Sequence, residues 1–240
     1  LPCSLLRLSS AASDLCKRQD RVTSLSEGRV DDPNDPDTNH WSEIRTEFDA
    51  NGQVASVETT YDNGVVQMDS YSDGQLTYSL SVDSRVSDAE PWQQIERFYD
   101  AQGQLQEEIT LLDTGIVETA HFASGVMTHR TQYDAPGVDA ADWTVIESFY
   151  DSLGQLEREV TTLDTGVIQD ETYVNGVLSY RVSYDDPGTN AMEWVVIEES
   201  FDEVGQLAVQ TVTYDNGIIA ESQYSDGVLN YHVEYDDPYS

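Results

Sequence analysis

Apolar and polar residues alternate along short runs of the chain between residues 41 and 238. In the clearest run, one side carries Leu178, Tyr180, Val182 and Tyr184 and the other carries Ser179, Arg181 and Ser183. A period of two with one polar face predicts a half-buried antiparallel β-strand. The first run of each unit differs, because Trp143 and Ile146 are three apart. We expect them to point to opposite faces, which favours a strand packed on both sides.

Short loops rich in Asp, Asn and Gly separate these runs. The segment Asp100-Ala101-Gln102-Gly103 predicts a type I turn with a glycine bulge, in which the Asp side chain bonds the turn backbone. A second turn follows at Asp113-Thr114-Gly115, and a third at Ser124-Gly125, where other copies carry Asp-Gly or Asn-Gly. These dipeptides are strong hairpin signals. Three turns predict four strands per unit.

The unit repeats with a fixed period of 51 residues. The four tryptophans of the chain mark it, at Trp41, Trp92, Trp143 and Trp194. A period near 50 residues indicates a repeat architecture, in which units stack on their neighbours. Each tryptophan opens the first strand of its unit, and we expect its ring to pack across the junction between copies.

The fold class predicted is all-β: four 51-residue tandem repeats of four antiparallel strands each, forming a continuous curled β-meander that encloses its apolar face. Proline in the one longer link, as in Asp185-Asp186-Pro187, blocks continued strand pairing there. The alternative is a four-bladed β-propeller, since four strands in about 50 residues also suit a propeller blade. The polar face of the fourth strand favours the meander, because blades pack on both faces.

The boundaries follow from the period. We expect an N-terminal arm with helical spacing at residues 1–30, a turn-rich linker at 31–40, and repeats at 41–91, 92–142, 143–193 and 194–240. The arm holds five basic and three acidic residues, so its net charge is +2. The net charge of the whole chain is −35, so the remaining residues carry −37. Cys3 and Cys16 both lie in the arm, as a disulfide or as two thiols. No segment has the ~20 apolar residues that a membrane span needs.

The acidic charge restricts the partners. With 46 acidic residues and one lysine, Lys17, the chain repels nucleic acids and anionic membranes. Calcium is the possible cofactor, since Asp side chains in tight turns supply the oxygen ligands of a hard cation. The candidate metal ligands are Asp185, Asp186, Asp236 and Asp237. Asx capping of turns and diffuse screening of cations explain the same residues without a specific site.

The residues favour a protein that is not an enzyme, because no nucleophile elbow, phosphate loop or zinc spacing occurs. His129 stands where other copies have Tyr180 and Tyr231, which favours a place in the core or in a cross-strand ladder. The tyrosine columns suit glycan binding, although aromatic ladders also stabilise sheets by about 0.2 to 1 kcal/mol per pair without a ligand.

The segment Phe98-Tyr99-Asp100-Ala101-Gln102-Gly103-Gln104-Leu105, repeated at residues 149–156, resembles the Tyr-Asp-x-x-Gly-Arg-Leu core of YD repeats. Gln104 replaces the arginine of that core, and two copies begin Phe-Asp. The whole unit also resembles acidic tandem repeats of large secreted, RTX-like bacterial proteins. The first resemblance implies a sheet wound into a shell; the second implies export and a role at the cell surface or in the extracellular matrix.

The function expected is therefore a non-enzymatic extracellular or cell-surface repeat module that acts as scaffold, spacer or adhesion and assembly segment. The alternative is a calcium- or glycan-binding module. The fourth copy reaches Asp237-Pro238 without a polar capping unit. We expect self-association or a larger assembly through terminal strand edges. The N-terminal arm is the other candidate for this contact.

Overall fold

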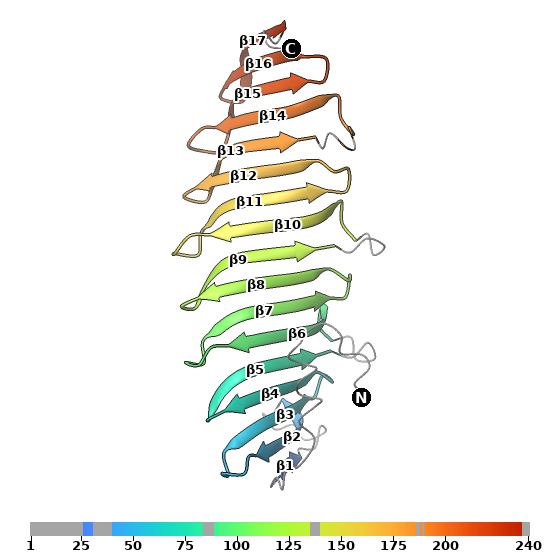
Figure 1. The fold of residues 1–240 in the computed structure, drawn as a ribbon, viewed down its shortest axis with the longest axis vertical. Coiled ribbons are helices and arrows are strands. Elements are labelled where there is room, and N and C mark those ends of the chain that lie inside the picture. Colours follow the sequence, from blue (N-terminus) through green and yellow to red (C-terminus); the bar gives the residue numbers. More distant parts are fainter. Residues whose placement is uncertain are drawn as a thin grey trace. The chain divides into compact units, whose positions relative to one another are not determined.

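The computed structural model describes residues 26–30, 40–83, 89–134, 140–185, 188 and 190–236. All regular elements in these ranges are β-strands, 17 in number. The chain divides into two compact units, Leu1–Ala89 with Ala101–Gly103, and Glu90–Asp100 with Gln104–Ser240. The first unit contains β1 to β5 and the second contains β6 to β17 (Figure 1).

The strands of the first unit are β1 (Ser26–Val30), β2 (Trp41–Phe48), β3 (Val54–Tyr61), β4 (Val66–Ser72) and β5 (Gln75–Val82). Each pairs antiparallel with the next along the chain. The strand β1 was not anticipated, because residues 26–30 were expected to belong to an arm with helical spacing. Residues 1–25 of that arm, with Cys3 and Cys16, and residues 31–39 of the linker lie outside the described residues.

The second unit holds twelve strands in chain order: β6 (Trp92–Tyr99), β7 (Leu105–Leu112), β8 (Val117–Ala123), β9 (Val126–Tyr133), β10 (Trp143–Tyr150), β11 (Leu156–Leu163), β12 (Ile168–Val174), β13 (Val177–Tyr184), β14 (Trp194–Phe201), β15 (Leu207–Tyr214), β16 (Ile218–Ser225) and β17 (Val228–Asp236). Every strand pairs antiparallel with its neighbours in sequence. This includes β9 with β10 and β13 with β14, across the links that contain proline. The all-β antiparallel meander is therefore confirmed. A propeller would place those strands in separate blades, so the alternative was wrong.

The three predicted turn types are present. Asp151 accepts hydrogen bonds from the backbone N–H groups of Leu153 and Gln155 at 2.8 and 2.9 Å. Gly154 N–H donates to the Asp151 carbonyl and has a φ of 79°. In the two-residue turn at Asn175-Gly176 both residues have positive φ, 51° and 76°. That backbone has the twist that a tight hairpin needs.

A β-bulge near the start of each first strand corrects one prediction. In β10, Trp143 lies opposite Leu163 and Ile146 lies opposite Thr161, with a register shift between Trp143 and Val145. Leu163 and Thr161 are two apart on a regular strand and share a face. Trp143 and Ile146 therefore also share a face, and the prediction that they point to opposite faces was wrong. Equal shifts occur after Trp41, Trp92 and Trp194.

A second bulge corrects the prediction for the fourth strand of a unit. The register of β13 against β12 shifts between Thr172 and Tyr173, so that Leu178 lies opposite Tyr173. Leu178 is thereby moved to the face opposite Tyr180, Val182 and Tyr184. The alternation predicted for this strand is correct only from Tyr180 onward.

Cross-strand pairing assigns two faces to the second unit. The tryptophan face carries Trp92, Trp143 and Trp194, and the tyrosine face carries Tyr133, Tyr184 and Tyr235. Within each unit, every described strand contacts only the strands to which it is hydrogen-bonded. No described element covers either face, so the predicted enclosure of one apolar face is not found within a unit. The few buried side chains, such as Val182 and Ser148, are covered by neighbours in their own sheet.

Candidate interaction surface

The tyrosine face presents an exposed aromatic surface. At one end of the strands, a row of large side chains crosses this face. Along the row, each side chain lies opposite the next or is separated from it by one threonine, Thr162 or Thr213. The row consists of Tyr133, Val145, Ile168, Tyr184, Val196, Ile219 and Tyr235. Tyr133, Tyr184 and Tyr235 are 42%, 46% and 40% exposed. Tyr180 and Tyr231, four residues before the last two, are exposed as well. Exposed large side chains in a contiguous row are typical of a contact surface.

Two of these tyrosines are held by carboxylates. Tyr180 Oη donates to Glu198 on the neighbouring strand at 2.8 Å, and Tyr235 Oη donates to Glu221 at 2.6 Å. Desolvation and the hydrogen bond to Glu198 raise the pKa of Tyr180 to about 12. The rings are therefore oriented by the sheet itself, with one apolar surface turned outward.

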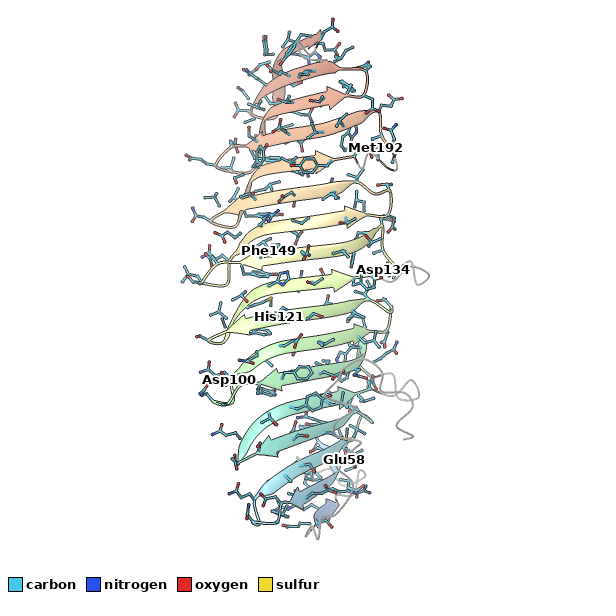
Figure 2. The ribbon with its side chains drawn as sticks, in the orientation of Figure 1. Glu58, Asp100, His121, Asp134, Phe149 and Met192 are labelled. Carbon is cyan, nitrogen blue, oxygen red and sulfur yellow. The ribbon has the colours of Figure 1, made fainter. Side chains whose placement is uncertain are left out.

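Nearer the middle of the tyrosine face lies a stack of rings, which we call the histidine stack: His121, His129, Phe149 and Arg158. The rings of His121 and His129 stack at 5.8 Å, and those of His129 and Phe149 at 4.7 Å. The Arg158 guanidinium lies 5.7 Å from the Phe149 centroid. Figure 2 labels His121 on β8 and Phe149 on β10, the two strands on either side of β9. Of the two places expected for His129, the core or a cross-strand ladder, the structure shows the ladder.

Arg158 closes the histidine stack with an ion pair. Its guanidinium donates to both carboxylate oxygens of Asp170, at 2.8 and 2.7 Å. The hydrogen bond and the charge of Asp170 raise the pKa of Arg158. The stack therefore needs no ligand to account for its order, since each member is in contact with the next.

The tryptophan face carries a polar ladder that crosses the strands, formed by Ser148, Glu159, Glu171, Arg181, Glu199 and Gln210. Arg181 Nε donates to Glu199 at 2.7 Å, and an Nη donates to Glu171 at 3.3 Å. Burial would lower the pKa of Arg181, but the hydrogen bonds and the charges of both glutamates outweigh it, so the pKa is raised.

Both glutamates have further donors. Tyr173 Oη donates to Glu171 at 2.6 Å, and Gln210 Nε2 donates to Glu199 at 2.8 Å. Desolvation and the bond to Glu171 raise the pKa of Tyr173. Because Glu199 is only 8% exposed, this ladder buries charge on a face that no described element of the unit covers.

Of the four predicted calcium ligands, the structure describes Asp185 and Asp236, so the calcium site stays a prediction. Asp185, at the end of β13, accepts hydrogen bonds from the backbone N–H groups of Ala191 and Met192 at 3.2 and 3.1 Å, and so caps the link to the next repeat. Asp134 does the same one repeat earlier for Ala140 and Ala141. Asp236 is an exposed residue at the end of β17. Asp186 and Asp237 lie outside the described residues.

Among the described residues, no group of three or more His, Cys, Asp or Glu side chains is placed to hold a metal ion. The same part of the chain contains no helix long and apolar enough to cross a membrane. A surface depression lies between two turns of the second unit, lined by Val174, Val177, Phe201 and Glu203. It holds no histidine or cysteine and only acidic titratable groups.

The comparisons give no family. No known protein family matches the chain, and no curated protein matches it. A Tc holotoxin pore from Photorhabdus luminescens is similar over 95% of this chain and 12% of its own, with 15% identity and a TM-score of 0.25. A porin-like protein from Bacteroides uniformis is similar over 83% of this chain and 90% of its own, with 10% identity and a TM-score of 0.19. At these scores neither likeness carries an inference beyond a chain rich in β-structure.

Sequence reasoning missed the polar ladder and the histidine stack. Successive members are 8 to 20 residues apart and meet only through the register, which three bulges per repeat shift. A signal was present, since Arg181 and Glu199 occupy the positions of Arg130 and Ser148 one repeat earlier. Comparing repeats position by position would have shown which columns are polar on the tryptophan face.

Proposed function

We propose that this chain is a non-enzymatic repeat module of the cell surface or extracellular space, acting as a scaffold, spacer and assembly segment. The observation that carries the proposal is that each strand contacts only its hydrogen-bonded neighbours within a unit. The stability of the sheet is then a sum of contributions from each repeat and from its contacts with adjacent repeats. Further repeats can therefore be added to the sheet without closing it into a ring. A module of this kind sets a distance by its number of repeats.

The charge supports the same role. With a net charge of −35, the chain repels itself and other acidic surfaces, which keeps two open faces soluble. The resemblance to YD repeats and to acidic repeats of large secreted proteins favours export. It rests on the Tyr-Asp and Gly-Gln-Leu positions of the first turn and on the 51-residue period.

Duplicating one repeat tests the spacer role. A chain with a second copy of residues 143–193 adds four strands to one sheet. Its maximum dimension in small-angle scattering should rise by about 19 Å, four spacings of about 4.8 Å. The circular dichroism per residue should stay unchanged. An insertion that unfolds the chain, or leaves the maximum dimension as it was, would count against the proposal.

The second candidate is a glycan-binding module, favoured by the exposed tyrosines of the tyrosine face. Replacing Tyr184 and Tyr235 by Ser should abolish binding to an oligosaccharide array if that function holds. Calcium binding remains a proposal beside it, through Asp185, Asp186, Asp236 and Asp237. A calorimetric titration with calcium decides it. A saturable heat of binding with a higher melting temperature supports a site. The absence of heat removes the calcium proposal and keeps the scaffold role.

A further inference from the structure

The short strand β1 occupies the place of a fourth strand. Its five residues pair with Glu43–Glu47 of β2, from Ser26 opposite Glu47 to Val30 opposite Glu43. In β10, the five positions that correspond to Glu43–Glu47 are Val145–Phe149, and these are the five that pair with β9. The same five positions of β14 pair with β13. Thus β1 covers the first-strand edge in the register that a preceding repeat would use.

The strand β1 protects the edge of β2 only weakly. It has five residues where β9 and β13 have eight, and Ser26 to Arg29 are all exposed. Gly28 stands opposite Arg45, where β13 has Val182, a side chain only 7% exposed. A Cβ added at Gly28 would meet nothing within 4 Å, so packing does not require glycine. A short, charged strand with a glycine at its centre is typical of a protected edge.

The strand β17 is the reverse case. It is a fourth strand, and among the described residues of its own unit it pairs with β16 alone. Its Val233 and Glu234 correspond to Val182 and Ser183, which the β13–β14 pairing buries to 7% and 5% exposure. Glu234 is exposed, and so are Tyr231 and Tyr235. The β9–β10 and β13–β14 junctions each pair a fourth strand with a first strand, and no first strand pairs with β17 in the part of this unit that the structure describes.

We propose that β17 of one copy pairs with β2 of a second copy, displacing β1. The register follows from the two internal junctions: Tyr231 opposite Glu47, Val233 opposite Arg45 and Tyr235 opposite Glu43. This contact rests on the proposed assembly role and deepens it by naming the partner and its register. It is a head-to-tail contact between different surfaces, so it builds open chains unless the rotation closes a ring.

The strength of the contact depends on salt. Each copy carries −35, and β17 contributes Glu234 and Asp236 to the contact. Screening of exposed charges over about 8 Å at physiological ionic strength reduces this repulsion. Association should therefore increase with added sodium chloride, whereas a contact driven by exposed ion pairs would weaken.

Disulfide trapping tests the register in the full chain, in a Cys3→Ser, Cys16→Ser background. Val233→Cys with Arg45→Cys places the thiols opposite each other, and Tyr235→Cys with Glu43→Cys repeats this two residues along. Air oxidation should give a ladder of multimers in both variants. Val233→Cys with Thr46→Cys is the matched control, because its thiols fall on opposite faces and should give none. Deleting residues 1–30 should increase the yield of multimers, since β1 competes for the β2 edge.

Multimers from the control at the same yield, or none from either matched pair, would overturn the proposal. A deletion of residues 1–30 that abolishes the multimers would overturn it as well, by placing the contact in the arm. Circular dichroism of each variant shows that the sheet is folded. The duplicated-repeat experiment is independent of association, so a failed cross-link beside a correct increase in length removes this contact and leaves the spacer role.

Discussion

Arg181 joins two repeats through Glu199. Its Nε lies 2.7 Å from the Glu199 carboxylate across the β13–β14 junction, and Glu199 is nearly buried. The bond connects the last strand of one repeat to the first strand of the next, where the connecting loop contains proline. Since no described element covers either face of this unit, such contacts replace part of the apolar core.

Replacing Arg181 by Met should destabilise the protein by about 1.5 to 3 kcal/mol, because Glu171 and Glu199 lose a charged donor. Urea denaturation followed by circular dichroism measures it. Arg45→Met is the matched control, since Arg45 bridges Glu43 and Glu58 but its side chain is 61% exposed. Its cost should stay below about 1 kcal/mol. Equal costs for the two variants would show that the polar ladder adds nothing beyond surface charge.

The third turn offers a reciprocal pair of substitutions. Ser124 has a φ of 52° and Asn175, at the same position one repeat later, has a φ of 51°. Asn tolerates this left-handed conformation better than Ser. Ser124→Asn should therefore stabilise the protein by about 0.5 kcal/mol, and Asn175→Ser should destabilise it by a similar amount. Both are read from urea midpoints. A change of the same sign in the two variants would contradict the backbone explanation.

Alkaline pH should destabilise the fold partly through Tyr180. Its pKa is raised from 10 to about 12 in the folded chain, so the unfolded chain loses the proton first. The stability that the protonated phenol provides is present below pH 10 and is lost as the pH rises toward 12. The urea midpoint of the native chain should fall more steeply over this range than that of Tyr180→Phe. Parallel curves would show that Tyr180 has no part in the loss.

The sequence was sufficient for β2 to β17 and for their hairpin turns, because their signals are local. The period of 51 residues, the Asp of the first turn and the Asn175-Gly176 dipeptide each determine a feature within a few residues. The face that each side chain occupies was harder to predict. It follows from the number of residues along the strand, and one extra residue at a bulge moves every later side chain to the other face. The bulge after Trp143 moved Ile146 to the same face, and the bulge opposite Thr172 moved Leu178 away from Tyr180.

The surfaces could not be predicted for a further reason. Alternating apolar residues usually imply a second layer over the apolar face, and we expected a sheet that curls to provide it. The structure instead distributes charge, tyrosine and small side chains over both faces of each unit. Nor did the arm's spacing indicate β1, since a strand of five polar and small residues has no periodic signal and exists only through its pairing with β2.

The central claim is that copies are held only by their neighbours, and removing one copy tests it most directly. Deleting residues 143–193 brings β9 against β14, with Tyr133 opposite Val196 in place of Val145. Thermal unfolding followed by circular dichroism should show a cooperative transition and an unchanged β signal per residue. Deleting only residues 143–155 is the control: it makes β9 and β11 run in the same direction and should disrupt the sheet. Loss of structure on removing the whole repeat would contradict the account.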